Sequence, residues 1–147
     1  RVQMAAADGP LGTRDYQIVF EAVPLDGGRT FIHFRYAYGF GTAARLAMKT
    51  YLATLGRGKI GFSTMPDDGG GAPVPVGGTR GAMERNAMRY YLAIAVYLDS
   101  LDKPAAERTE QRLQAWYAAT ERYARQLHEL ERDDYLKMKR AELGRQG

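Results

Sequence analysis

The chain has 147 residues, of which 45% are hydrophobic and 26% are charged, and it contains no cysteine. This composition suits one globular domain over residues 1–147 and excludes a disordered tail, disulfide bonds, thiolate metal sites and a cysteine nucleophile. The net charge is +4, and most cations stand beside an acid, which indicates solvated helix faces and no nucleic-acid partner.

Residues 1–40 alternate apolar and polar side chains as paired strands do. This period-2 pattern, rich in β-branched and aromatic residues, predicts three strands with one dry face each. The expected strands are Val2–Ala7, Tyr16–Val23 and Phe31–Tyr38. Asp8–Gly12 and Pro24–Gly28 supply the Gly and Pro residues of the two turns. We therefore predict an α+β fold that begins with an antiparallel β-meander.

The last of these strands has one face rich in aromatic residues. It carries Ile32, Phe34, Tyr36 and Tyr38 on one side, with His33 on the other. Two interpretations stay open: plain core packing, or the wall of a cavity. The tyrosines favour a partly polar cavity, because a buried phenol needs a hydrogen-bond partner. We expect His33 at the surface.

After Gly39 the pattern becomes helical. The predicted helices cover residues 42–55, 79–101, 104–130 and 133–143, with Thr42 and Thr79 as N-caps and Pro104 at a helix start. In the helix over 104–130, Leu113, Trp116, Tyr117 and Thr120 belong to an apolar stripe. Such a stripe packs against a neighbouring element.

The helix over residues 79–101 has two unlike halves. Its second half, Tyr90–Leu98, is apolar on almost every side, yet far shorter than the ~20 residues needed to cross a bilayer. We expect this helix to be central, buried by the sheet and other helices or by another subunit. Its first half carries a polar patch: Arg80, Glu84, Arg85, Asn86 and Arg89. The patch is either a ligand site near a helix N-terminus, which attracts anions, or an ion-paired helix start.

Residues 65–78 form a long connection rich in Gly, Pro and Asp. A connection of this kind is a flexible lid, a binding loop or a disordered segment. Asp67 and Asp68 alone offer too few oxygen ligands for calcium. We expect no metal and no cofactor.

Residues Tyr16–Tyr38, with the turn Pro24–Thr30, resemble the late strands of START-like, Bet v 1-type helix-grip domains. The resemblance implies a curved antiparallel sheet that wraps a long C-terminal helix and encloses a cavity for lipids, sterols or polyketides. Such domains have more strands ahead of Val2, so we expect further structure before Arg1. The chain also resembles uncharacterised bacterial proteins with Tyr-rich helices after a stretch like Gly77–Gly81, which implies a bacterial source, in the cytoplasm or the periplasm.

Three functions follow from these patterns. The first is binding or transport of a hydrophobic small molecule or lipid in a cavity between sheet and helices. Its expected lining is Phe20, Phe34, Tyr36, Tyr90, Tyr91 and Ile94, with Arg85 and Arg89 at a polar or anionic head group. The second is a structural or assembly module that forms a homo-oligomer or docks a partner through its apolar helices. The third is a cyclase- or hydrolase-like enzyme, although no catalytic motif is present and we expect His128 at the surface.

Overall fold

The computed structural model of the chain describes residues 1–9, 12–54, 56–67 and 69–145. The chain divides into two compact units, Arg1–Arg57 and Gly58–Gly147. The sequence predicts one domain over the same residues. The first unit contains a three-stranded antiparallel sheet and a helix, and the second contains the C-terminal helices and a two-stranded ribbon. The predicted α+β class, a β-meander followed by helices, is therefore confirmed.

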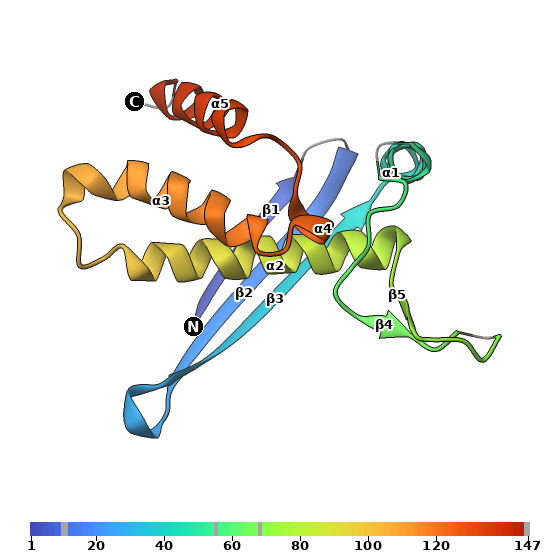
Figure 1. Cartoon of the computed structure of the whole chain (residues 1–147), viewed down its shortest axis with the longest axis horizontal. Coiled ribbons are helices and arrows are strands. Elements are labelled where there is room, and N and C mark those ends of the chain that lie inside the picture. Colours follow the sequence, from blue (N-terminus) through green and yellow to red (C-terminus); the bar gives the residue numbers. More distant parts are fainter. Residues whose placement is uncertain (10–11, 55, 68, 146–147) are drawn as a thin grey trace. The chain divides into compact units, whose positions relative to one another are not determined.

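The sheet of the first unit is a meander with the strand order β1-β2-β3 (Figure 1). Its strands are β1 (Val2–Asp8), β2 (Thr13–Pro24) and β3 (Thr30–Phe40). All three predicted strands are confirmed: β1 begins at the predicted residue and runs one residue further, and β2 and β3 extend beyond both predicted ends. The hairpin between β2 and β3 closes through a short 3-10 turn, η2 (Asp26–Gly28), whose two glycines have φ of 74° and 70°. The other predicted turn, Asp8–Gly12, lies partly outside the described residues.

The two faces of the sheet carry different cross-strand pairs. Phe20 pairs with Phe34 across β2 and β3, and both side chains are half-buried. The next pair, Glu21 and His33, points to the opposite face because side chains alternate along a strand. There His33 Nδ1 lies 3.0 Å from Glu21 Oε2. His33 is exposed, as predicted.

Helix α1 (Thr42–Ala53) follows β3. The prediction that Thr42 caps it is wrong: Gly41 is the last extended residue (φ −74°, ψ 172°), and Thr42 already belongs to the helix. The helix also ends earlier than predicted, because Thr54 leaves helical conformation (φ −115°, ψ −97°). The predicted last residue, Leu55, lies outside the described residues.

The second unit contains the helices α2 (Gly78–Asp99), α3 (Ala105–Glu121), α4 (Ala124–Leu127) and α5 (Arg132–Gly144). Helices α2 and α3 lie side by side and run in opposite directions (Figure 1). Together with α4 they hold a buried apolar cluster. Its buried members are Leu92, Ala119 and Leu127, with Phe62, Met88, Val96 and Trp116 packed against them.

The prediction of one helix over residues 104–130 is wrong. Helix α3 ends at Glu121, and Tyr123 departs from helical geometry with φ −122° and ψ 40°. The single turn of α4 then places Leu127, which is 3% exposed, in the core. His128 follows in extended conformation, and its Nδ1 lies 3.0 Å from the Glu121 carboxylate. The break therefore lets the chain turn back and cover α2 and α3.

Helix α2 departs from expectation at its start and along its surface. Gly77, which is extended, is its N-cap, and the predicted cap Thr79 lies inside the helix. The sequence predicts that this helix is buried, because Tyr90–Leu98 is apolar on almost every side. Leu92 is 3% exposed, but Tyr91 and Tyr97 are 57% and 51% exposed, so α2 keeps a large apolar surface in the structure.

The Gly- and Pro-rich connection contains a short ribbon. Strand β4 (Thr64–Met65) pairs antiparallel with β5 (Val74–Pro75). Between them the Asp67 carboxylate accepts a hydrogen bond from the Gly71 N–H at 3.0 Å. Asp68 lies outside the described residues. A role for this connection as a lid or a binding loop stays a prediction.

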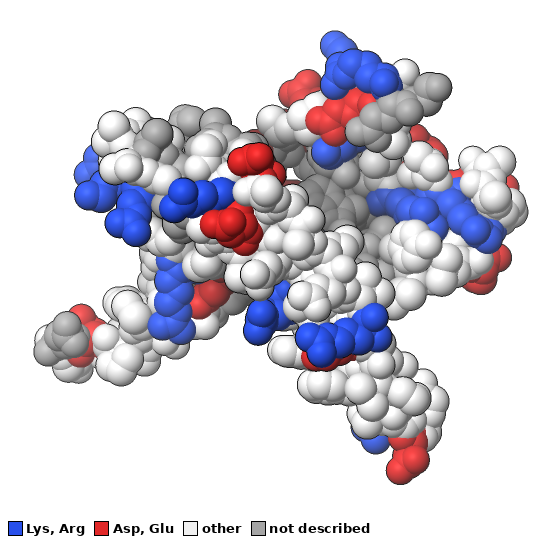
Figure 2. Space-filling model, turned by 180° about the vertical axis from the view of Figure 1, so that it is seen from behind, with Lys and Arg blue, Asp and Glu red and all other residues white. Residues whose placement is uncertain are grey.

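The surface carries charges of both signs. On the face drawn in Figure 2, Lys and Arg side chains are interspersed with Asp and Glu in small groups. Within the described ranges, no helix has both the length and the apolar character that crossing a membrane requires.

Candidate functional site

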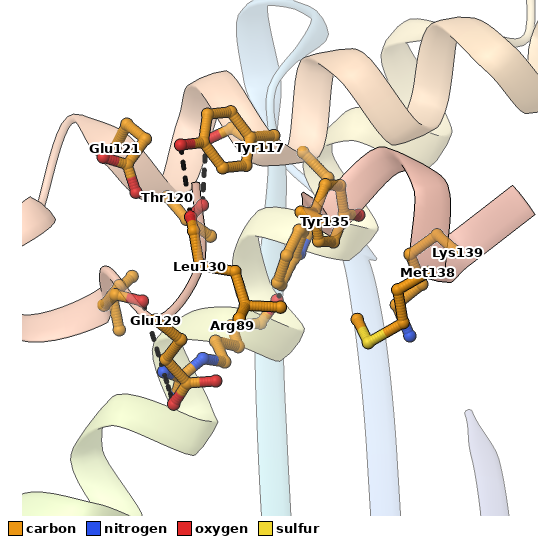
Figure 3. A pocket seen from close by; sticks show the side chains of 11 residues that line it. Arg89, Tyr117, Thr120, Glu121, Glu129, Leu130, Tyr135, Met138 and Lys139 are labelled. Carbon is orange, nitrogen blue, oxygen red and sulfur yellow. Dashed lines mark hydrogen bonds and ion pairs between the residues drawn. The ribbon is translucent and has the colours of Figure 1, made fainter. Parts of the chain in front are cut away.

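Two adjoining hollows lie among the helices of the second unit. The first, of about 180 Å³, is bordered by α2, α3, α4 and α5 (Figure 3). The second, of about 390 Å³, is bordered by α2, α3 and α5. Both hollows are lined by Arg89, Trp116, Tyr135 and Lys139. Because they share these walls, the two hollows form one site, here called the helical groove.

A stack of aromatic rings forms the wall that the two hollows share. The Trp116 and Tyr135 rings lie 5.3 Å apart with an interplanar angle of 25°, and Tyr117 lies 5.5 Å from Tyr135 at 32°. Since the Tyr135 ring faces both neighbours, the stack does not form the open cage that binds a quaternary ammonium group. It instead provides a rigid apolar wall.

Tyr135 is the most buried of these rings. It is 6% exposed, and burial, with a smaller contribution from Glu142, raises the pKa of its hydroxyl to about 12. The hydroxyl is therefore protonated at neutral pH. It adds a neutral hydrogen-bonding group to the lining and no charge.

Arg89 and Lys59 converge on one carboxylate oxygen of Glu129, a residue that lines the first hollow. Arg89 Nη2 donates to Glu129 Oε1 at 2.7 Å, and Lys59 Nζ lies 3.5 Å from the same oxygen. Each cation also binds backbone: Arg89 donates to the carbonyl of Leu127 and Lys59 to that of His128, both at 3.4 Å. The Arg89 contacts are visible in Figure 3. The cations are therefore held in place by more than Glu129.

Lys139 approaches the groove from α5. Its Nζ donates to Glu142 Oε2 at 2.7 Å, one turn further along the same helix. This bond and the Lys139 charge hold the pKa of the Glu142 carboxyl below its usual value of 4.5. Both hollows are therefore lined by two cations, Arg89 and Lys139.

The polar patch at the start of α2 divides into two parts. Glu84 Oε2 accepts hydrogen bonds from the N–H groups of Phe62 and Ser63 at 2.8 and 2.9 Å, and its Oε1 accepts one from Arg80. Burial opposes the charged form of Glu84, but these hydrogen bonds outweigh it and lower the pKa of the carboxyl below 4.5. This part of the patch fits the interpretation of an ion-paired helix start.

Arg85 is buried beneath the same segment. It is 2% exposed, and its Nη1 donates to the carbonyl of Ile60 at 3.3 Å. Arg85 therefore helps to hold the chain that precedes α2. Its predicted contact with a ligand head group stays a prediction.

The structure brings together only some of the residues predicted to form a site. Arg89 and Tyr90 line the helical groove, Ile94 is half-buried, and Tyr91 is 57% exposed. The remaining predicted residues, Phe20, Phe34 and Tyr36, belong to the sheet of the first unit. Their part in a cavity with the helices stays a prediction.

Sequence reasoning missed Tyr135, Lys139 and Glu129 as site residues. It identified Trp116 and Tyr117 only as members of a packing stripe. Tyr135, Lys139 and Glu129 reach the groove through a long-range arrangement. Helix α5 returns to α3 because the helix breaks at Tyr123, and no spacing of residues in the sequence predicts that return.

In the first unit, Tyr36 belongs to an aromatic cluster. Its ring lies 6.1 Å from Tyr16 and 5.1 Å from Tyr38, and Tyr16 stacks on Tyr38 at 5.2 Å. The register of β2 against β3 shifts between Arg14 and Gln17, the segment that contains Tyr16. An open hollow of about 280 Å³ next to the cluster is lined by residues of β1 and β2, among them Tyr16.

No protein-family model, curated protein or solved structure matches the chain. The relationship to START-like helix-grip domains therefore stays a prediction, and the function has to be inferred from the geometry of the groove.

Proposed function

We propose that the protein binds a small hydrophobic molecule with an anionic head group in the helical groove. The observation that supports this is the shared lining of the two hollows: the Trp116–Tyr135 stack, Arg89 and Lys139 border both. Pockets for small molecules combine apolar and aromatic walls with a few polar groups that fix orientation. Here the aromatic stack supplies the wall, and Arg89 and Lys139 supply the polar groups.

The size of the groove limits the ligand. Ligand pockets commonly have volumes of roughly 300–1,000 Å³. The second hollow, at about 390 Å³, is near the lower end of that range, and the first hollow, at about 180 Å³, is below it. A short aliphatic or single-ring acid fits these volumes better than a sterol does. The proposed ligand lies among the helices of the second unit.

Trp116 gives a direct test, because it is the only tryptophan of the chain. Titration with decanoate and with decanol, followed by Trp116 fluorescence, should give saturable changes for both. Decanoate should bind more tightly, because only it carries a charge for Arg89 and Lys139. Arg89→Met should weaken decanoate binding by roughly ten-fold, the equivalent of one charge-assisted hydrogen bond, and change decanol binding little.

Arg122→Met is the matched control. Arg122 is an exposed cation at the end of α3 and does not line either hollow, so its loss should leave both affinities unchanged. The absence of a saturable signal with either probe, together with no retained ligand in native mass spectrometry, would rule out the proposed function.

A second function is self-association through α2, favoured by the exposure of its apolar residues. Within α2, Tyr91, Tyr97 and Leu98 are 57%, 51% and 48% exposed, and Leu101, just beyond the end of the helix, is 44% exposed. No charged residue occurs in Tyr90–Leu98. Two identical apolar surfaces can pack about a two-fold axis, each covering the other. The occupant proposed for this surface is therefore a second copy of the chain.

A further inference from the structure

We infer that Glu129 is an internal competitor for the ligand: its carboxylate occupies the position that the anionic head group takes on binding. This inference rests on the function proposed above and adds the class of head group and a residue that sets affinity. It makes the ligand a carboxylate-bearing amphiphile whose acid group replaces Glu129 between Arg89 and Lys59.

The two cations form a position for an anion that does not depend on Glu129. Arg89 and Lys59 are only 19% and 25% exposed in their side chains. Their additional bonds go to the carbonyls of Leu127 and His128, which belong to the backbone and remain when Glu129 moves. Removal of Glu129 therefore leaves both cations on their backbone partners, with Arg89 in the lining that the two hollows share.

Glu129 itself is free to leave. Its side chain is 54% exposed, more than twice the exposure of either cation. Ion pairs of such exposure contribute little to stability, because water solvates the separated charges well. Glu129 also lies in the extended connection between α4 and α5, where His128 has φ −60° and ψ 129°, so its side chain can swing outward without unwinding a helix.

The geometry also selects the chemistry of the head group. One oxygen of Glu129 meets Arg89 Nη2 at 2.7 Å and Lys59 Nζ at 3.5 Å. A ligand carboxylate reproduces this arrangement, and the adjoining hollow accepts its apolar body. A neutral alcohol has no charge with which to compete, so Glu129 lowers the affinity for the acid selectively.

The experiment compares Glu129→Gln with Glu131→Gln in the full chain, again by Trp116 fluorescence with decanoate and decanol. Glu131 is the matched control because it lies two residues further along the same connection and is 82% exposed in its side chain. Glu129→Gln should tighten decanoate binding by roughly two- to five-fold, the range expected for removal of a partly exposed competing ion pair. Decanol binding should not change, and Glu131→Gln should change neither affinity.

Lys59→Met provides a second variant with the opposite sign. It should weaken decanoate binding by roughly three-fold or more and leave decanol binding unaltered, so the inference can be judged even where Glu129→Gln folds poorly. If both probes bind but Glu129→Gln leaves decanoate affinity equal or lower, the competitor role is overturned and the proposed function stands. If neither probe binds any variant, the proposed function falls and this inference with it.

Discussion

At the residue scale, the start of α2 depends on a close approach of two backbones. A Cβ atom at Gly81 would lie 2.8 Å from the carbonyl oxygen of Val76 and 3.1 Å from the amide nitrogen of Gly61. These two backbone groups are hydrogen-bonded to each other. Neither can move aside without loss of that bond, so only glycine fits at residue 81.

Gly81→Ala should therefore destabilise the protein, although alanine in a helix is ordinarily favoured over glycine by about 1 kcal/mol. We expect a net loss of about 1–3 kcal/mol in the free energy of unfolding, as in other overpacked sites. Urea denaturation followed by circular dichroism measures it. Gly144→Ala is the control: it also lies in a helix, and among the described residues no atom comes within 4 Å of the position that its Cβ would take. Equal stabilisation by both substitutions would contradict the steric argument.

At the element scale, a two-pronged ion pair joins α3 to α5. Arg140 donates to both carboxylate oxygens of Glu110, through Nε at 3.0 Å and through Nη2 at 2.5 Å. The hydrogen bonds from Arg140, and then from Gln114, lower the pKa of Glu110 to about 2 from 4.5. Since α5 contributes Tyr135 and Lys139 to the helical groove, this pair helps to keep the groove closed on one side.

The pair should show a defined pH dependence. A carboxyl whose pKa is lower in the folded state stabilises the protein fully above its unfolded pKa and loses that contribution as the pH falls. For Glu110 the loss should occur between pH 4.5 and about 2. A double-mutant cycle with Glu110→Gln and Arg140→Met, measured by urea denaturation, should give a coupling energy at about pH 7 that shrinks at about pH 3. A coupling energy that is the same at both pH values would refute the assignment.

Much of the order of strands and helices can be predicted from local sequence patterns, but the helical groove cannot. The strands and the hairpin at Asp26–Gly28 are predictable because alternation and turn chemistry act over a few residues. The break at Tyr123 is not, since neither Gly nor Pro marks it. The pairing of Glu110 with Arg140, 30 residues apart, and the stacking of Trp116 on Tyr135 depend on that break, so spacing rules along one helix cannot find them.

At the scale of the whole molecule, the exposed residues of α2 predict self-association. Light scattering should give a concentration-dependent mass that rises toward twice the 16.4 kDa of one chain. The double substitution Tyr91→Ser with Leu98→Ser should return the mass to that of one chain, because it removes apolar surface from the contact. Leu46→Ser is the control, since Leu46 is 67% exposed but belongs to α1. A single-chain mass for the unaltered protein at every concentration would exclude a second copy.

The contacts of Glu21 have a consequence for how the meander assembles. Glu21, on the central strand, binds His33 on β3 and lies 3.3 Å from Arg1, the residue just before β1. A one-residue slip of β3 would move His33 to the face of Phe20 and Phe34 to the face of Glu21, because alternate side chains exchange faces. The Glu21 carboxylate therefore favours one register of the hairpin. A misaligned hairpin would lose both the Glu21–His33 contact and the Phe20–Phe34 pair.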